Sequence, residues 1–191
     1  MTGGQRITGL SDRDAPLWLR ALNALQRRVF GQVLEPTRVW ARAPAALSGF
    51  VQLFAAVDRA GSPIEPPLRS LVTVKVSQVN NCSFCIDINA GLLQQRGVSL
   101  EKALSLKDYR QSPLFTAREL AALDYAVEMT RANTVADETF DRLRVHFDDD
   151  AIVELTALIA LQNASSKFNA ALAIPSQGFC PAMAPSDVDE T

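Results

Sequence analysis

Two cysteines, Cys82 and Cys85, have the spacing that thiol–disulfide chemistry requires. They stand in the segment 79–89, where a CxxC is followed by apolar residues at helical spacing. Two thiols one turn apart at the start of a helix can close a disulfide between them. Backbone N–H groups and the helix dipole at such a terminus also favour the thiolate, which lowers the pKa of a nearby thiol. The pair therefore predicts a redox centre.

The compartment bears on how such a pair is used. Residues 1–6 contain no apolar core of the signal-peptide type, so we expect a cytoplasmic protein. In a reducing compartment a CxxC indicates catalysis or metal binding rather than a structural disulfide. A zinc site is disfavoured, because there is no second CxxC and His146 is the only histidine. The alternative to redox activity is a pair of buried structural thiols that behave as small apolar residues.

Composition disfavours several other classes of function. The 191 residues carry a net charge of -2 with no run of Lys or Arg, which gives no reason to expect nucleic-acid binding. The longest apolar run, residues 152–161, is interrupted by Glu154 and Thr156 and is too short to span a bilayer. We therefore expect a globular protein with no nucleic-acid or membrane partner, no metal and no cofactor.

Helical periodicity dominates the chain. The cysteine-bearing helix is expected to be capped by Asn80 or Asn81 and to end near Gly97. Four other helices are expected. One opens at Pro16, and a second runs from Pro44 to about Arg59 with Leu47, Phe50, Val51 and Phe54 buried. A third follows the capping box Thr116–Glu119, and a fourth follows the acidic cluster 148–150. The first of them places Leu19, Leu22, Leu25, Val29 and Val33 on roughly one face.

Residues 68–79 fit two patterns. Val72, Val74 and Val76 alternate with polar residues, as they would in a strand. Apolar residues of the same segment also share one helical face, and no other convincing strand exists to pair with it. We therefore predict a buried helix. The helix over 152–161 is apolar nearly all round, which predicts a place at the centre of the fold or in a subunit interface.

Three segments, in this order, resemble the AhpD-like, carboxymuconolactone decarboxylase superfamily. Residues 68–85 are similar to its core around the CxxC, 115–126 to its next helix and 152–172 to its last long helix. The resemblance implies an all-α domain, a helical bundle that assembles as a homo-oligomer. It divides the chain into an N-terminal extension with one helix (1–35), an AhpD-like domain (36–180) and an irregular tail (181–191).

The resemblance also implies an activity. In the peroxidase branch of the family, the cysteines cycle between dithiol and disulfide while they reduce hydroperoxides. By position, Cys85 would attack the peroxide and Cys82 would resolve the sulfenic acid. We therefore expect a thiol-dependent peroxidase of the alkylhydroperoxidase or peroxiredoxin type, in antioxidant defence. Its partners would be a hydroperoxide or other small oxidant and a thiol electron donor.

Two positions depart from the family pattern. The family has a glutamate where this chain has Ser70, and a histidine where it has Asn89. In the family those residues form a proton relay to the thiol, but serine is no base near neutral pH and asparagine has no titratable proton. Asn89 shares the cysteines' helical face and could hydrogen-bond a thiolate or hold a water. Glu65 and Asp58 are carboxylates that the fold could bring to the site.

The sequence also allows two other functions. One is a lactone decarboxylase-like acid–base enzyme on the same fold, against which the CxxC argues. Another is a degenerate member that serves as a redox sensor or a binding oligomer, since both relay residues are replaced. His146 is expected to cap or pack at a helix boundary. Cys180 is expected to be an ordinary free cysteine rather than an extra resolving thiol.

Overall fold

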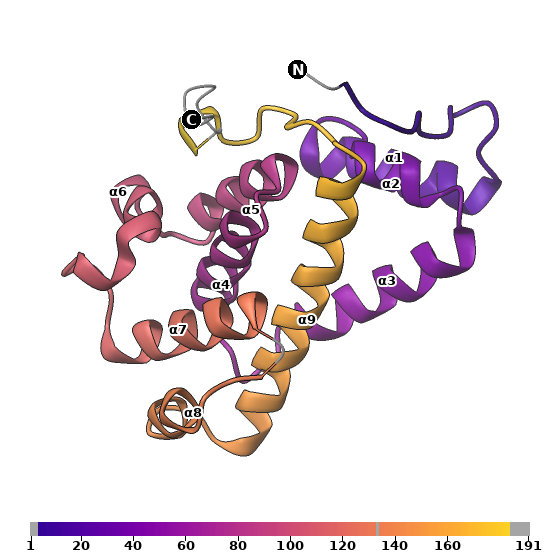
Figure 1. Ribbon diagram of the computed structural model, residues 1–191. Helices are drawn as coiled ribbons and strands as arrows, with labels where there is room; N and C mark the ends of the chain where they lie inside the picture. Colours follow the sequence, from indigo (N-terminus) through magenta and orange to yellow (C-terminus); the bar gives the residue numbers. More distant parts are fainter. Residues whose placement is uncertain (1–3, 133, 184–191) are drawn as a thin grey trace.

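A hairpin of two helices, α4 (Pro66–Val79) and α5 (Ser83–Gln95), carries the cysteine pair (Figure 1). The computed structural model describes residues 4–132 and 134–183, and over these residues it contains helices and no strand. The all-α fold is thus confirmed, including the segment that fitted both patterns. Val72, Val74 and Val76 are all fully buried, because α4 is covered on several sides rather than on one.

The remaining helices lie around this hairpin (Figure 1). None of the helices within the described ranges is long and apolar enough to cross a membrane. In chain order the helices outside the hairpin are α1 (Leu17–Phe30), α2 (Glu35–Trp40), α3 (Pro44–Val57), α6 (Leu100–Leu104), the 3-10 segment η1 (Ser105–Gln111), α7 (Ala117–Arg131), α8 (Asp137–Arg144), α9 (Asp149–Ala171) and the 3-10 turn η2 (Pro181–Met183).

The long helix α9 packs against α3, α4, α5, α7 and α8, which confirms its predicted central position (Figure 1). Leu155 and Ile159 are fully buried, whereas Val153 points outward and is exposed. The helix begins where the acidic cluster predicted, because Asp148 caps it through a hydrogen bond from the backbone N–H of Ala151, 2.8 Å long. The capping box predicted at the start of α7 is also present.

The two expected helices of the N-terminal third are present, but their apolar faces are only partly covered. Leu19 of α1 is buried as predicted, while Leu25 and Val29 are 56% and 60% exposed. In α3, Val51 and Phe54 are 39% and 44% exposed, so the prediction of their burial was wrong. Among the residues that the structure describes, these four apolar side chains are only partly covered.

The C-terminal segment is irregular up to η2, yet it is held firmly against α5. The buried carboxylate of Asp87 accepts backbone hydrogen bonds from Gln177 (2.8 Å), Gly178 (2.7 Å) and Cys180 (2.6 Å). Bonds from several N–H groups to one carboxylate are among the stronger hydrogen bonds in proteins. In the same segment, the ring of Phe179 packs edge-on against that of Phe84, next to the cysteines. Asp87 therefore ties this segment to the helix that carries the thiols.

The substitution Asp87→Ala is expected to release the C-terminal segment from α5. Hydrogen–deuterium exchange should show loss of protection at the amides of residues 177–180, and the free energy of unfolding should fall by about 1–3 kcal/mol. Asp149→Ala, at an exposed acidic position in the first turn of α9, is the matched control. Unchanged protection at residues 177–180 in Asp87→Ala would contradict the prediction.

Candidate active site

The cysteine pair lies at the first turn of α5, and Cys82 is the residue that caps the helix. Its Sγ accepts a hydrogen bond from the backbone N–H of Cys85, 3.2 Å long. The expected cap at Asn80 or Asn81 was therefore wrong. Asn81 instead forms the turn out of α4 with a φ of 50°, a left-handed conformation that asparagine adopts more readily than most residues.

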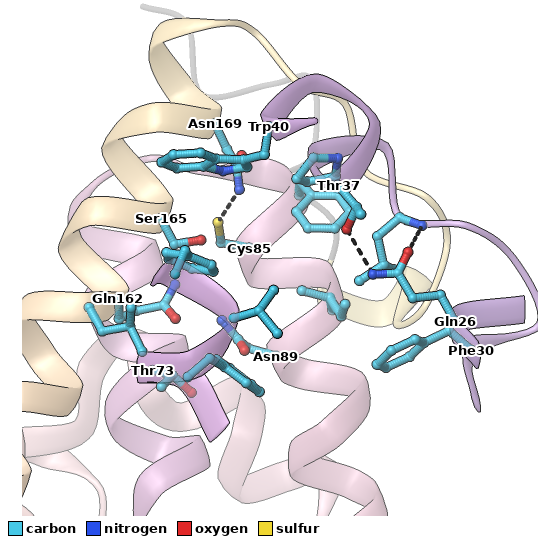
Figure 2. Close-up of a pocket in the computed structure, with 18 of the residues that line it drawn as sticks. Gln26, Phe30, Thr37, Trp40, Thr73, Cys85, Asn89, Gln162, Ser165 and Asn169 are labelled. Atoms are coloured by element: carbon cyan, nitrogen blue, oxygen red, sulfur yellow. Dashed lines mark hydrogen bonds between the residues drawn. The ribbon is translucent and has the colours of Figure 1, made fainter. Parts of the chain in front are cut away.

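A cavity of about 360 Å³ opens beside Cys85 (Figure 2). Cys85 lines it and Cys82 does not, so the two thiols face different surroundings. The cavity wall comes from α1 to α5 and α9, and no lining residue carries a charge. Its polar members are Gln26, Thr37, Thr73, Asn89, Gln162, Ser165 and Asn169, and its apolar members include Phe30, Leu34, Trp40, Phe84, Ile88, Leu92, Leu158 and Leu161.

Stacked rings and a buried amide fix the wall of this pocket on the side of α2. The ring of Trp40 stacks on those of Phe168 and Phe50, with centroids 3.9 and 5.4 Å apart, and so joins α2 to α9 and α3. The side chain of Gln26 in α1 donates to the hydroxyl of Thr37 in α2 at 2.7 Å. The short helix α2, which the sequence patterns did not reveal, thus holds Trp40 over Cys85 (Figure 2).

Polar residues of α9 surround the sulfur of Cys85 from the other side. Nδ2 of Asn169 donates to Cys85 Sγ at 3.2 Å (Figure 2). Gln162, Ser165 and Ser166 precede Asn169 by seven, four and three residues along the same helix, so the four share the face that meets the hairpin. Sequence reasoning missed these four as site residues. The available signal was a row of polar residues at helical spacing in an otherwise apolar helix.

The surroundings shift the pKa values of the two thiols in opposite directions. A hydrogen bond from Cys82 lowers the pKa of Cys85 most, and those from Asn169, Ser166 and Ser165 add to it, against the opposing effect of burial. The pKa of Cys82 is raised, because its proton is held in the hydrogen bond to Cys85 and burial disfavours a second charge. Of the two thiols, Cys85 is therefore the one whose ionised form the surroundings favour.

The two positions that differ from the family pattern are placed apart. Asn89 lines the pocket, but its Nδ2 donates to the hydroxyl of Ser77 at 3.3 Å rather than to a sulfur. Gln162 also donates to that hydroxyl, at 3.0 Å, which makes an uncharged network beside the pocket. Ser70 is buried in α4 outside the pocket lining, and its hydroxyl accepts from Arg96 at 3.0 Å.

The carboxylates that the fold could have brought to the site are occupied elsewhere. Asp58 forms ion pairs with Arg69 at 2.9 Å and with Arg96 at 2.6 Å. Glu65 pairs with Arg118. Neither carboxylate lines the pocket, so neither replaces the base of the family relay.

His146 and Cys180 also lie away from the thiol pair. His146 follows α8 in the turn that leads into α9, and its backbone N–H donates to the carbonyl of Leu143 at 3.0 Å. Cys180 is a buried free thiol whose Sγ accepts from Gln94 at 3.5 Å, and it packs in a different apolar cluster from Cys82 and Cys85. Within the described ranges, no three His, Cys, Asp or Glu side chains gather closely enough to hold a metal ion.

Comparison with known proteins places this site in a family. Residues 44–128, which include the whole hairpin and the CxxC, match the carboxymuconolactone decarboxylase family. The chain belongs to this family. The uncharacterised protein YnjA of Escherichia coli (strain K12) is 43% identical over 166 residues, which cover 86% of this chain and 91% of YnjA.

Several solved structures share the fold. The AhpD-core, peroxidase-related protein of Ralstonia eutropha JMP134 superimposes with a TM-score of 0.83 at 20% identity and covers 92% of this chain and 94% of its own. The debrominase Bmp8 gives 0.81 at 22% identity, over 93% and 95% of the chains. A cysteine-to-alanine variant of Bmp8 in complex with 2,3,4-tribromopyrrole gives 0.77 at 22% identity, over 90% of each chain. At these identities the likeness shows the fold alone.

The alkylation of Cys85 is expected to reveal its lowered pKa. In a Cys180→Ala protein, the rate with iodoacetamide should rise with pH and reach its plateau below the pH at which an ordinary cysteine does, because the thiolate forms earlier. Replacing Cys82 with alanine as well removes the largest cause of the shift, so the midpoint should move to higher pH. Mass spectrometry of the alkylated peptide gives the rate. The same midpoint with and without Cys82 would contradict the assignment.

Proposed function

We propose that the protein is a thiol-dependent oxidoreductase that reduces hydroperoxides, with Cys85 as the attacking thiol and Cys82 as the resolving thiol. The observation that carries the proposal is that Cys85 lines the pocket while Cys82 lies behind it at the helix cap. An oxidant in the pocket would meet the thiol with the lowered pKa first. The resolving thiol, one helical turn away, keeps its proton until it is needed.

The proposed cycle balances as follows. The thiolate of Cys85 attacks the terminal oxygen of the hydroperoxide, the O–O bond breaks, and an alkoxide leaves and takes a proton to become the alcohol. Cys85 is then a sulfenic acid. The sulfur of Cys82 attacks the sulfur of Cys85, and the hydroxyl group leaves with the proton of Cys82 as water. A disulfide remains, which an external thiol donor returns to the dithiol.

Neutral hydrogen-bond donors take the place of the family's proton relay in this proposal. A general base typically contributes about 10²–10⁴-fold to a rate, and no carboxylate or imidazole lines this pocket. The thiolate would instead be maintained by the proton of Cys82 and the amide of Asn169. The AhpD-core, peroxidase-related neighbour supports a peroxidase role, which we propose serves antioxidant defence in a cytoplasm that supplies thiol donors.

The absence of charge in the pocket lining disfavours a decarboxylase. A lactone substrate with a carboxylate would call for a Lys, Arg or His beside it and for an acid or base at the reacting carbon. The lining holds amides, hydroxyls, a thiol and apolar groups. Such a pocket favours an uncharged, largely apolar molecule.

Reductive debromination of an aromatic ring is a second candidate, which the Bmp8 complex with tribromopyrrole and the apolar pocket favour. The thiolate of Cys85 would take bromine from a ring carbon, and that carbon would gain a proton. Cys82 would then displace bromide to form the disulfide and release its own proton. The overall result converts the aryl bromide and two thiols into the arene, a disulfide and hydrogen bromide.

Substitution of each cysteine is expected to separate their roles. With one equivalent of cumene hydroperoxide, the native protein should lose two alkylatable thiols, Cys82 and Cys85, as measured by intact mass. Cys85→Ser should lose none, because the attacking sulfur is gone. Cys82→Ser should accumulate a sulfenic acid at Cys85 that dimedone traps. Bromide release from 2,3,4-tribromopyrrole tests the second candidate on the same samples.

The control for this experiment is Cys180→Ser, which should behave as the native protein does. Equal residual reactivity in Cys85→Ser and Cys82→Ser would contradict the assigned roles. If all three native thiols stay alkylatable with both substrates, the redox proposal fails, and a binding oligomer becomes the better explanation.

We also propose that the protein forms a homo-oligomer. The exposed residues Leu25, Val29, Val51 and Phe54 belong to the wall of the pocket, so a second copy against them would close its outer side. Leu25→Glu should reduce the mass measured by light scattering to that of one chain, 20.8 kDa. Val145→Glu, at another exposed apolar position, is the control. A native protein of one-chain mass would contradict the proposal.

A further inference from the structure

Asn169 carries a hydrogen-bonding atom that the assembled site leaves unused. The residue is 1% exposed and lines the pocket, and its Nδ2 donates to Cys85 Sγ at 3.2 Å (Figure 2). Its Oδ1 is buried and has no hydrogen-bond partner among the residues that the structure describes. Buried amide oxygens in folded proteins nearly always have one, so this oxygen needs an explanation.

The position of this oxygen points to a ligand. Oδ1 and Nδ2 are bonded to the same carbon, so a proton donor on Oδ1 would lie within a few ångströms of the sulfur. Two other buried amide oxygens in the described chain, Asn23 Oδ1 and Gln78 Oε1, also have no partner. Neither residue lines the pocket, so of the three only Asn169 joins an unused acceptor to the reactive thiol.

We propose that Asn169 is a substrate-binding residue that orients the reacting group at Cys85. Its Nδ2 donates a hydrogen bond to the thiolate of Cys85, and its Oδ1 accepts a hydrogen bond from an O–H or N–H of the substrate. The substrate class is therefore an uncharged, largely apolar molecule whose proton donor is on, or next to, the atom that the sulfur attacks. This inference rests on the proposed function and adds to it the group that selects the substrate.

An alkyl hydroperoxide has this arrangement. The oxygen that the thiolate attacks is the one that bears the hydrogen, so a hydrogen bond from that O–H to Oδ1 brings the oxygen to the sulfur. The alkyl group would then extend along apolar side chains of the pocket such as Phe84, Ile88 and Leu161. The sulfur–oxygen bond forms as the O–O bond breaks, and the alkoxide leaves on the side away from Asn169.

The test compares two reagents on the same thiol. Iodoacetamide reports the ionisation and exposure of Cys85, while cumene hydroperoxide also needs the proposed hydrogen bond. Both rate constants are measured over a range of pH and taken at the plateau, where Cys85 is fully ionised. In Asn169→Leu, the plateau constant for cumene hydroperoxide should fall by about tenfold or more, since misorientation of a reacting group has effects of this order. The plateau constant for iodoacetamide should change by no more than about threefold, since it does not depend on that orientation.

Two further variants keep the test decisive. Asn169→Asp retains an acceptor but loses the donor, so its alkylation midpoint should move to higher pH while its plateau constant for cumene hydroperoxide stays above that of Asn169→Leu. If Asn169→Leu does not fold, Asn169→Ser replaces it. Asn163→Ala is the matched control, because Asn163 is an amide of the same helix that bonds to Asn80 and Thr130 outside the pocket. Both of its constants should equal the native ones.

The outcomes distinguish this inference from the function on which it rests. Native protein that does not react with cumene hydroperoxide overturns both. Native reactivity, with equal fractional losses for the two reagents in Asn169→Leu, overturns the inference alone and leaves the peroxidase proposal standing. The inference is also overturned if the lower rate constant of Asn169→Leu with cumene hydroperoxide is explained entirely by a smaller ionised fraction of Cys85.

Discussion

The contact between the polar face of α9 and the α4–α5 hairpin is the interaction on which the candidate site depends. Through it, Asn169 reaches the sulfur of Cys85, and Gln162 reaches the hydroxyl of Ser77. Both bonds lie in apolar surroundings, where hydrogen bonds are strong and an unpaired polar group is costly. They therefore fix the register of α9 against α5, and that register decides which groups surround the thiol.

The pocket is lined by uncharged residues. Asp58, Arg69 and Arg96 form a partly buried ion-pair group outside that lining, and Arg96 also donates to Ser70, the position at which the family has its glutamate. A carboxylate near the thiol would have raised its pKa, whereas the donors found here lower the pKa of Cys85. The reactivity of Cys85 therefore depends on how far its own thiol is ionised. The pocket around it is suited to uncharged molecules.

The periphery of the fold supports the same site. Asp87 accepts hydrogen bonds that hold the C-terminal segment against the cysteine-bearing helix, and the stacking of Trp40 on Phe168 holds α2 against α9. The apolar side chains of Leu25 and Phe54 remain exposed at the outer wall of the pocket. Helices α1 and α3 thus line the pocket and also expose apolar side chains on the outside of the molecule.

Local patterns in the sequence determined the longer helices, the caps at Thr116 and Asp148, and the position of the cysteine pair at a helix start, because each depends on residues within one or two turns. They did not reveal the short helix α2. They could not determine what surrounds Cys85. Asn169 is 84 residues away in the chain, and only the packing of α9 brings the two together. The same holds for Ser70 and Asn89, because the resemblance to the family implied one relay at these positions, whereas Asn89 lines the pocket and Ser70 does not. Side-chain environment at a site is set by contacts between distant segments, and no local period encodes them.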